Sequence, residues 1–176
     1  MKKCALFFIF SLVIFKCMAL EIKSDVFDNG GYLPDRYTPS AQNFSPLLFW
    51  SDVPANTESF ALICEDPDAP FKVCVHWVLY DIPKETSVLK ENISDQDLAD
   101  LGIKKGTNDF GKIGYQGPCP PQGKSHKYIF KLYALDKAIG LGEGANKKDV
   151  IEAIQGHILA EAKTTAIYQK PKDSQQ

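Results

Sequence analysis

Two histidines occupy strand-like positions from which their side chains could contact a ligand. His76 lies inside the apolar run 73–81, and His126 is followed two positions later by Tyr128. Residues two apart in a β-strand point to the same face, so His126 and Tyr128 share a face. An imidazole that takes up a proton near neutral pH and a phenolic hydroxyl both donate hydrogen bonds to an anion. The structural alternative is that these are buried polar groups bonded to backbone atoms.

Two carboxylates and a glycine–proline loop precede these histidines. Asp66 and Asp68 bracket Pro67 ahead of the first histidine strand. There an Asp either stabilises a turn through its own backbone or orients a histidine or a ligand amine. The loop 114–123 (GYQGPCPPQG) comes just before the second histidine. Its glycines allow backbone N–H groups close to a ligand, and its prolines reduce the entropy lost on binding.

The same residues allow two other kinds of chemistry. A hydrolase could use Cys119 as nucleophile, with one of the two histidines as base and Asp66 orienting it. Against this, Cys119 lies between two prolines, and the sequence identifies no oxyanion hole. A metal site could be formed by His76, His126 and Asp66. Since the loop and Tyr128 suit an anion at least as well, we expect anion binding without a catalytic residue, a cofactor or a metal.

The elements that position these residues indicate one domain of mainly β structure. The chain has 176 residues, 44% of them hydrophobic and 24% charged, which is the balance of one domain with a buried core. Its formal net charge of -2 argues against nucleic-acid binding. Short apolar runs between turn residues predict strands at 60–64, 73–81 and 127–135. Alternation along the second of these places His76 on one face with Val78 and Tyr80.

Two helices are expected. Ser94, followed by Asp97, caps a short helix that runs through Leu101 and stops at Gly102. A second helix begins after Asn146. The residues that lie along one side of it at three- and four-residue steps are Val150, Ile154, His157, Ile158 and Glu161, and we expect its apolar side to pack on the sheet. The stretch 102–125 between them is rich in glycine and proline, and a loop of that length is usually functional.

The first 19 residues have the features of a signal peptide. Lys2 and Lys3 precede the apolar run 4–15, and small residues lead to an expected cleavage after Ala19. The domain would then comprise residues 20–176, exported to the periplasm or secreted, with no stable membrane span after processing.

Three cysteines remain in the expected domain, which export would place in an oxidising compartment. Cys64 and Cys74 flank the loop 66–70 on strands that we expect to be neighbours, and we predict a disulfide bridge between them. If the two are offset, both are small core residues instead.

The chain resembles the phosphatidylethanolamine-binding protein family in four motifs that occur in order. They are DPDAP at 66–70, HW at 76–77, GYQGPCPP at 114–121 and HKY at 126–128. In detail the chain looks like the bacterial, Raf-kinase-inhibitor-like branch, over about residues 22–170. The resemblance implies a large central antiparallel sheet packed on a smaller sheet. It also implies non-enzymatic binding of a small anion, such as phosphate or a phospholipid headgroup, and regulation of a protein partner such as a kinase or a protease.

Carried over position by position, the resemblance places the binding pocket at one end of the large sheet. The expected ligand-binding residues are Asp66, Asp68, Pro70, His76, Gly117, Pro118, His126 and Tyr128. Tyr168 would match an aromatic residue that some family members contribute from a terminal helix or tail.

Overall fold

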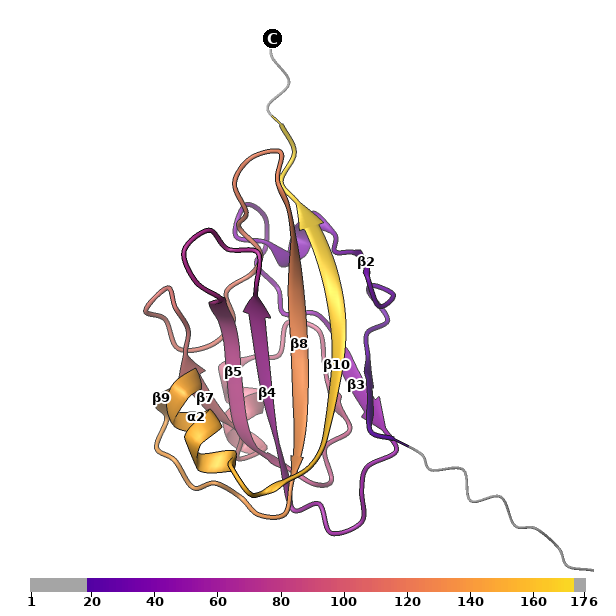
Figure 1. Ribbon diagram of the computed structural model, residues 1–176, viewed down its shortest axis with the longest axis vertical. Coiled ribbons are helices and arrows are strands. Elements are labelled where there is room, and N and C mark those ends of the chain that lie inside the picture. Colours follow the sequence, from indigo (N-terminus) through magenta and orange to yellow (C-terminus); the bar gives the residue numbers. More distant parts are fainter. Residues whose placement is uncertain (1–18, 173–176) are drawn as a thin grey trace, which may run out of the picture.

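The described part of the chain forms two β-sheets of unequal size (Figure 1). The computed structural model describes residues 19–172, so the expected signal peptide lies, except for Ala19, outside the described residues. The strands are β1 (Glu21–Lys23), β2 (Gly31–Tyr32), β3 (Leu48–Ser51), β4 (Ser59–Asp66), β5 (Cys74–Pro83), β6 (Val88–Leu89), β7 (Lys104–Thr107), β8 (Ser125–Leu135), β9 (Gly144–Asn146) and β10 (Ile158–Gln169). The helices are a 3-10 turn (Asp35–Tyr37), α1 (Asp95–Asp100) and α2 (Lys147–Ile154).

The large sheet has seven strands in the order β2-β10-β8-β4-β5-β7-β9, and the small sheet has the order β1-β3-β6. The outer pairs β10/β2 and β7/β9 are parallel, and the long inner strands are antiparallel to one another. The strands expected from the apolar runs are confirmed as β4, β5 and β8. The expected fold class, a large sheet on a smaller one with few helices, is confirmed as well.

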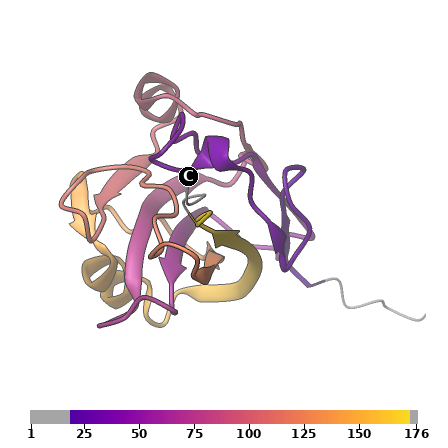
Figure 2. The ribbon, with the colours of Figure 1, turned by 90° about the horizontal axis from the view of Figure 1, so that it is seen from above.

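The centre of the large sheet is covered on both faces, which explains why its strands are so apolar. All eight residues of β4 are buried. Phe60, Leu62 and Cys64 belong to the core between the two sheets. Ala61 and Ile63 belong to a second cluster on the opposite face, where α2 packs (Figure 2). Successive β-strand side chains point to opposite faces, so a doubly covered strand needs apolar residues at consecutive positions.

Helix α1 forms as the sequence predicts. The Ser94 side chain accepts the N–H of Asp97, and the Asp97 carboxylate accepts the N–H of Ser94, so the cap is reciprocal. Gly102, with φ +76°, ends the helix in the left-handed region that favours glycine. None of the helices within residues 19–172 is long and apolar enough to cross a membrane.

The second helix is shorter than the three- and four-residue spacing predicts. Asn146 caps α2, but the helix ends at Ile154, and the expected continuation to Glu161 is wrong. Gly156 has φ +78°, and the chain enters β10 two residues later. From Ala162 to Tyr168 burial alternates with period two, because these side chains lie on a sheet face beside the eleven-residue strand β8. The long antiparallel ladder overrides a helical pattern that a few spaced apolar residues had indicated.

Candidate functional site

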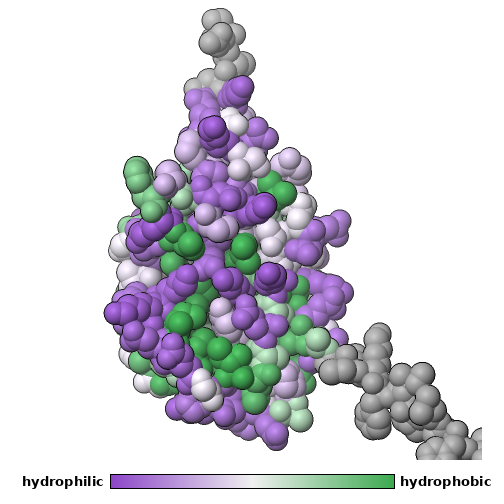
Figure 3. Space-filling model, viewed as in Figure 1, coloured by the Kyte–Doolittle hydropathy of each residue, from purple (hydrophilic) through white to green (hydrophobic). Residues whose placement is uncertain are grey.

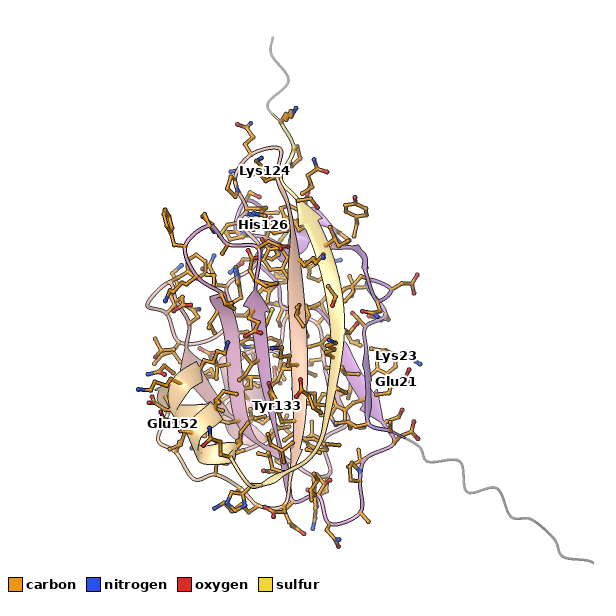
Figure 4. All side chains as sticks on the ribbon, viewed as in Figure 1. Glu21, Lys23, Lys124, His126, Tyr133 and Glu152 are labelled. Atoms are coloured by element: carbon orange, nitrogen blue, oxygen red, sulfur yellow. The ribbon has the colours of Figure 1, made fainter. Side chains whose placement is uncertain are left out.

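A cavity of about 330 Å³ opens at the end of the large sheet where β4 ends and where β5 and β8 begin. Figure 4 labels His126 at this end, beside Lys124, and the space-filling view of Figure 3 shows mostly hydrophilic surface there. The lining of the cavity comes from three strands and two loops: Asp66, Ala69, Pro70, Cys74, His76, Phe110, Cys119, Pro120, Pro121 and His126. Four of the expected ligand-binding residues, namely Asp66, Pro70, His76 and His126, therefore line one cavity.

Asp66 and His126 form a buried hydrogen-bonded pair in the wall of this cavity. The strands β4 and β8 are neighbours, with Glu65 opposite Ile129, which brings the end of one strand beside the start of the other. His126 Nδ1 donates to Asp66 Oδ2 over 2.7 Å, and the N–H of Asp68 donates to Asp66 Oδ1 over 2.8 Å. The carboxylate therefore fixes both the orientation of the imidazole and the turn that follows β4.

Asp68 stabilises the turn and does not line the cavity. Its Oδ2 accepts the backbone N–H of Lys127 over 2.8 Å, which ties the turn to the start of β8. Of the two roles open to this carboxylate in the sequence, the structure shows the structural one.

A β-bulge aims His76 at the site. In the β4/β5 pairing, Cys64 is opposite Trp77 but Glu65 is opposite Val75, so His76 is the extra residue. Its carbonyl accepts the N–H of Gln116 over 3.0 Å, and its Nδ1 donates to the Gln116 carbonyl over 2.7 Å. Because His76 has no residue opposite it on β4, its hydrogen bonds are made instead with the backbone of Gln116 in the loop 108–121.

The bulge also corrects an expectation about the face of this strand. Simple alternation places His76 with Val78 and Tyr80, but those two residues pack under α2. The His76 ring instead contacts Tyr128, a residue of the core between the sheets, in a T-shaped arrangement with a centroid distance of 5.1 Å. The expectation was wrong because one inserted residue reverses the order of faces beyond it.

His76 is buried and neutral at physiological pH. Only 2% of its surface is exposed, and burial lowers the pKa of its imidazole below the ordinary 6.5. Because Nδ1 is bonded to the Gln116 carbonyl, Nε2 is the ring nitrogen available to a ligand. An anion at Nε2 would stabilise the protonated imidazole and raise this pKa again.

Tyr128, which the sequence placed in the binding pocket, does not line the cavity. Its ring packs on that of His76, and its buried hydroxyl has no hydrogen-bond partner among the described residues. Burial and the neighbouring Asp66 carboxylate raise its pKa, so the hydroxyl keeps its proton as a donor. Leaving such a group unpaired is unfavourable by about 1–3 kcal/mol, which a bound molecule could offset. Trp50 Nε1, in the core between the sheets, is likewise buried without a partner among the described residues, so the unpaired hydroxyl does not by itself mark a binding site. Its relevance here is that Tyr128 packs on the cavity-lining His76.

The loop 108–121 forms the wall opposite Asp66. Asn108 organises its start: Oδ1 accepts the N–H groups of Phe110 and Lys112, and Nδ2 donates to the Gly114 carbonyl. The next residue, Asp109, accepts the N–H of Val75 and so fastens the loop to β5. Phe110 packs on the His76 ring and lines the cavity, although its position in a polar, glycine-containing stretch did not single it out in the sequence.

Gly117 and Pro118 are buried behind the cavity wall and do not line the cavity. The N–H of Gly117 donates to Asn43 Oδ1, and a Cβ at this position would lie 2.1 Å from the Tyr37 carbonyl oxygen. Glycine is therefore required for close packing against the segment 37–43, not for contact with a ligand. The wall itself is made by the next three residues, Cys119, Pro120 and Pro121.

Tyr168 does not reach the cavity. It lies in β10, not in a terminal helix or tail, and its hydroxyl donates to Asp35 Oδ1 over 3.1 Å. Its aromatic ring is part of the core between the sheets.

The predicted bridge between Cys64 and Cys74 is wrong. Cys64, Cys74 and Cys119 are all free thiols. Cys64 is opposite Trp77, whereas Cys74 is opposite Asp66 two positions further along β4, so the two cysteines are offset in the ladder. Cys64 is instead a small residue of the core between the sheets.

The two alternative chemistries find little support in this geometry. Within residues 19–172, no group of three or more His, Cys, Asp or Glu side chains is arranged to hold a metal ion, so the trio of Asp66 and the two histidines forms no such site. Both histidines direct Nδ1 to partners other than Cys119. Burial raises the pKa of the Cys119 thiol, which opposes formation of a nucleophilic thiolate.

The fold and the site together define a two-sheet β-protein. At one end of its larger sheet an open cavity is lined by two histidines and a buried carboxylate. The family model for phosphatidylethanolamine-binding protein matches residues 23–169. The chain belongs to this family, as the four motifs indicated.

Individual relatives agree with this assignment. A UPF0098 protein of Methanothermobacter thermautotrophicus is 47% identical over 151 residues, which cover 86% of this chain and 99% of the relative. A UPF0098 protein of Aquifex aeolicus is 45% identical, over 86% of this chain and 89% of the relative. Among solved structures, a phosphatidylethanolamine-binding protein homologue of Chlamydia trachomatis superposes with a TM-score of 0.80 at 35% identity, covering 87% and 99% of the two chains. YbcL of Escherichia coli gives 0.78 at 32% identity, covering 85% and 98%.

Proposed function

We propose that this protein is a non-enzymatic binding protein for a small anion, either phosphate or the phosphorylated headgroup of a lipid. The observation that carries the proposal is the convergence of His76 and His126 on one cavity, with Tyr128, whose hydroxyl is unpartnered among the described residues, packed against His76. These groups supply hydrogen-bond donors, and each imidazole gains a positive charge on protonation. Family membership supports a ligand-binding protein of this type.

The Asp66 carboxylate shapes the choice of anion. It repels a bare anion, but its hydrogen bond from His126 offsets part of that repulsion, and a protonated His126 would neutralise it. A zwitterion such as phosphoethanolamine could place its phosphate near the imidazoles and its ammonium near Asp66. We therefore expect phosphoethanolamine to bind at least as well as inorganic phosphate.

Two further parts of the proposal rest on the sequence alone. We infer export from the features of residues 1–19, and regulation of a kinase or a protease from the family resemblance. In this role the chain would act by binding, without covalent chemistry on its ligand.

Calorimetric titration with phosphate and with phosphoethanolamine, from mildly acidic to mildly basic pH, tests the binding function. Affinity should fall as pH rises, because the bound anion favours protonated imidazole and binding takes up protons. His76→Ala and His126→Ala should each weaken binding, whereas His157→Ala, at the other end of β10, should not. Binding that is absent or independent of pH would refute the proposal. Ester hydrolysis that Cys119→Ser abolishes would support the hydrolase instead.

A further inference from the structure

A second concave surface lies at the far end of β5 from the anion cavity. This groove has a volume of about 530 Å³, and its walls are the segment 83–90, which contains β6, and the segment 93–101, which contains α1. Cys74, the first residue of the ten-residue strand β5, lines the anion cavity, and Pro83, the last residue of that strand, lines the groove. The two sites are therefore about 30 Å apart along the strand. In Figure 2, α1 lies at the edge of the molecule, away from α2.

The groove presents apolar side chains to solvent. Val88 on one wall and Leu101 on the other are 48% and 44% exposed, and Ile93 contributes from between them. Single exposed apolar residues are common on protein surfaces, but here they gather on facing walls of one concavity. Apolar side chains that gather in one concavity can pack against apolar side chains of a partner.

The two walls are held rigidly. Lys90 Nζ lies 2.8 Å from Asp97 Oδ1, an ion pair that joins the strand wall to the helix wall. The reciprocal cap of Ser94 and Asp97 fixes the start of α1, and the buried Leu98 anchors the helix to the core. A groove with pre-formed walls loses little entropy when it binds a partner.

One wall also offers an unused strand edge. β6 pairs with β3 through Leu89 opposite Leu48 and Val88 opposite Phe49, and it is the last strand of the small sheet among the described residues. Because β6 is only two residues long, an extended segment can form no more than one or two main-chain hydrogen bonds with it, and side chains that enter the groove would make most of the contact.

The charged side chains that line the groove determine which charge a bound segment should carry. Glu85, Asp97 and Asp100 contribute three carboxylates, against the single ammonium of Lys90. Lys90 is already paired with Asp97, whose pKa it helps to lower to about 2, so Glu85 and Asp100 leave the lining net negative. Complementarity therefore favours lysine or arginine and disfavours an acidic segment.

We propose that this groove binds an extended segment of a partner protein in which apolar and basic residues alternate. The apolar side chains would pack on Val88 and Leu101, and the basic ones would meet Glu85 and Asp100. This inference is independent of the anion-binding function, because it uses no residue of the cavity.

A titration of the isotope-labelled full chain, followed by amide resonances, tests the proposal. The probe is a capped hexapeptide of alternating valine and lysine, and its control carries glutamate in place of lysine. Shifts should be confined to residues 83–101 and their contacts, and the acidic peptide should bind about tenfold more weakly or not at all. Equal binding of both peptides, or shifts elsewhere, would overturn the proposal.

Two variants locate the binding surface. Val88→Lys should abolish peptide binding, whereas Val53→Lys, the same change at another exposed valine outside the groove, should leave it intact. Charge reversal by Glu85→Lys with Asp100→Lys should weaken binding about tenfold, and both sites are exposed enough to keep the fold. The Tm of each variant, compared with that of the parent, serves as the check that each variant is folded. If Val88→Lys instead abolishes self-association in sedimentation and leaves peptide binding unchanged, a second copy occupies the groove and the proposal fails.

Discussion

His126 Nδ1 lies 2.7 Å from Asp66 Oδ2, and the two residues, sixty positions apart in the chain, form one wall of the cavity. Adjacent strands β4 and β8 make this contact, and the turn through Asp68 closes around it. The pair is buried, so its hydrogen bonds contribute to stability as well as to the orientation of the imidazole.

Asp66→Ala should lower the free energy of unfolding by about 1–3 kcal/mol, because it leaves the buried His126 Nδ1–H and the Asp68 N–H without an acceptor. Urea denaturation measures this change. Glu152→Ala, which removes an exposed carboxylate on α2, should change stability by less than about 0.5 kcal/mol. If Asp66→Ala lowers the free energy of unfolding as little as Glu152→Ala does, the Asp66–His126 pair contributes nothing to the stability of the fold.

Protonation of His76 should destabilise the folded protein. Its pKa is below 6.5 in the folded state, so as pH falls through about 6.5 the unfolded chain binds the proton first. The contribution of neutral His76 to the free energy of unfolding is therefore complete above pH 6.5. It is lost as pH falls toward the lower pKa of the folded state. His76→Gln should show a flatter dependence of Tm on pH than the parent, and His157→Gln should not.

Phosphate should counteract this acid sensitivity, because a bound anion raises the pKa of His76. The increase in Tm on adding phosphate should be larger at mildly acidic pH than at mildly basic pH. An increase that is the same at both would show that the anion does not interact with the charged imidazole.

Gly117→Ala should distort the wall of the cavity. The new Cβ would meet the Tyr37 carbonyl oxygen and Asn43 Oδ1, so we expect a loss of about 1–3 kcal/mol in unfolding free energy and weaker phosphate binding. Gly142→Ala is the matched control, since a Cβ there has no neighbour within 4 Å. If both variants behave alike, the close approach at Gly117 does not shape the loop.

The three thiols of the domain should react with iodoacetamide in a fixed order. Cys119 is exposed, although burial of its thiol raises its pKa. Cys74 is half-buried with a pKa raised by burial to about 11, and Cys64 is buried with a pKa raised well above its ordinary value. Peptide mapping should therefore find Cys119 modified first and Cys64 last, and all three should be reactive in denaturant without a reductant. A Cys64–Cys74 linkage in that map would contradict the offset register.

If the chain is exported as proposed, the processed protein should begin at Leu20. Cleavage there leaves β1 intact, since that strand starts at Glu21. Intact-mass measurement of the exported protein gives the start directly. Retention of residues 1–19 in a membrane fraction would indicate an anchor instead.

Local patterns in the sequence were sufficient for several features of the molecule. The apolar runs predicted β4, β5 and β8, and the pairing of Ser94 with Asp97 predicted α1. These features depend on side-chain burial within a strand or on hydrogen bonds within one turn, both of which act over a few residues. The family motifs added the convergence of Asp66, His76 and His126, which no local pattern contains.

Tertiary structure decided the rest, because the deciding partners are distant in the chain. Whether residues 158–169 form a helix or a strand depends on β8, and which face His76 occupies depends on a bulge that the loop at Gln116 stabilises. Gly117 serves the backbone of residues 37–43 instead of a ligand, and the register of β4 against β5 separates Cys64 from Cys74. An inserted residue, a long strand partner or a close loop contact decides each of these outcomes, and none of them is visible in the composition or the local spacing from which the predictions were made.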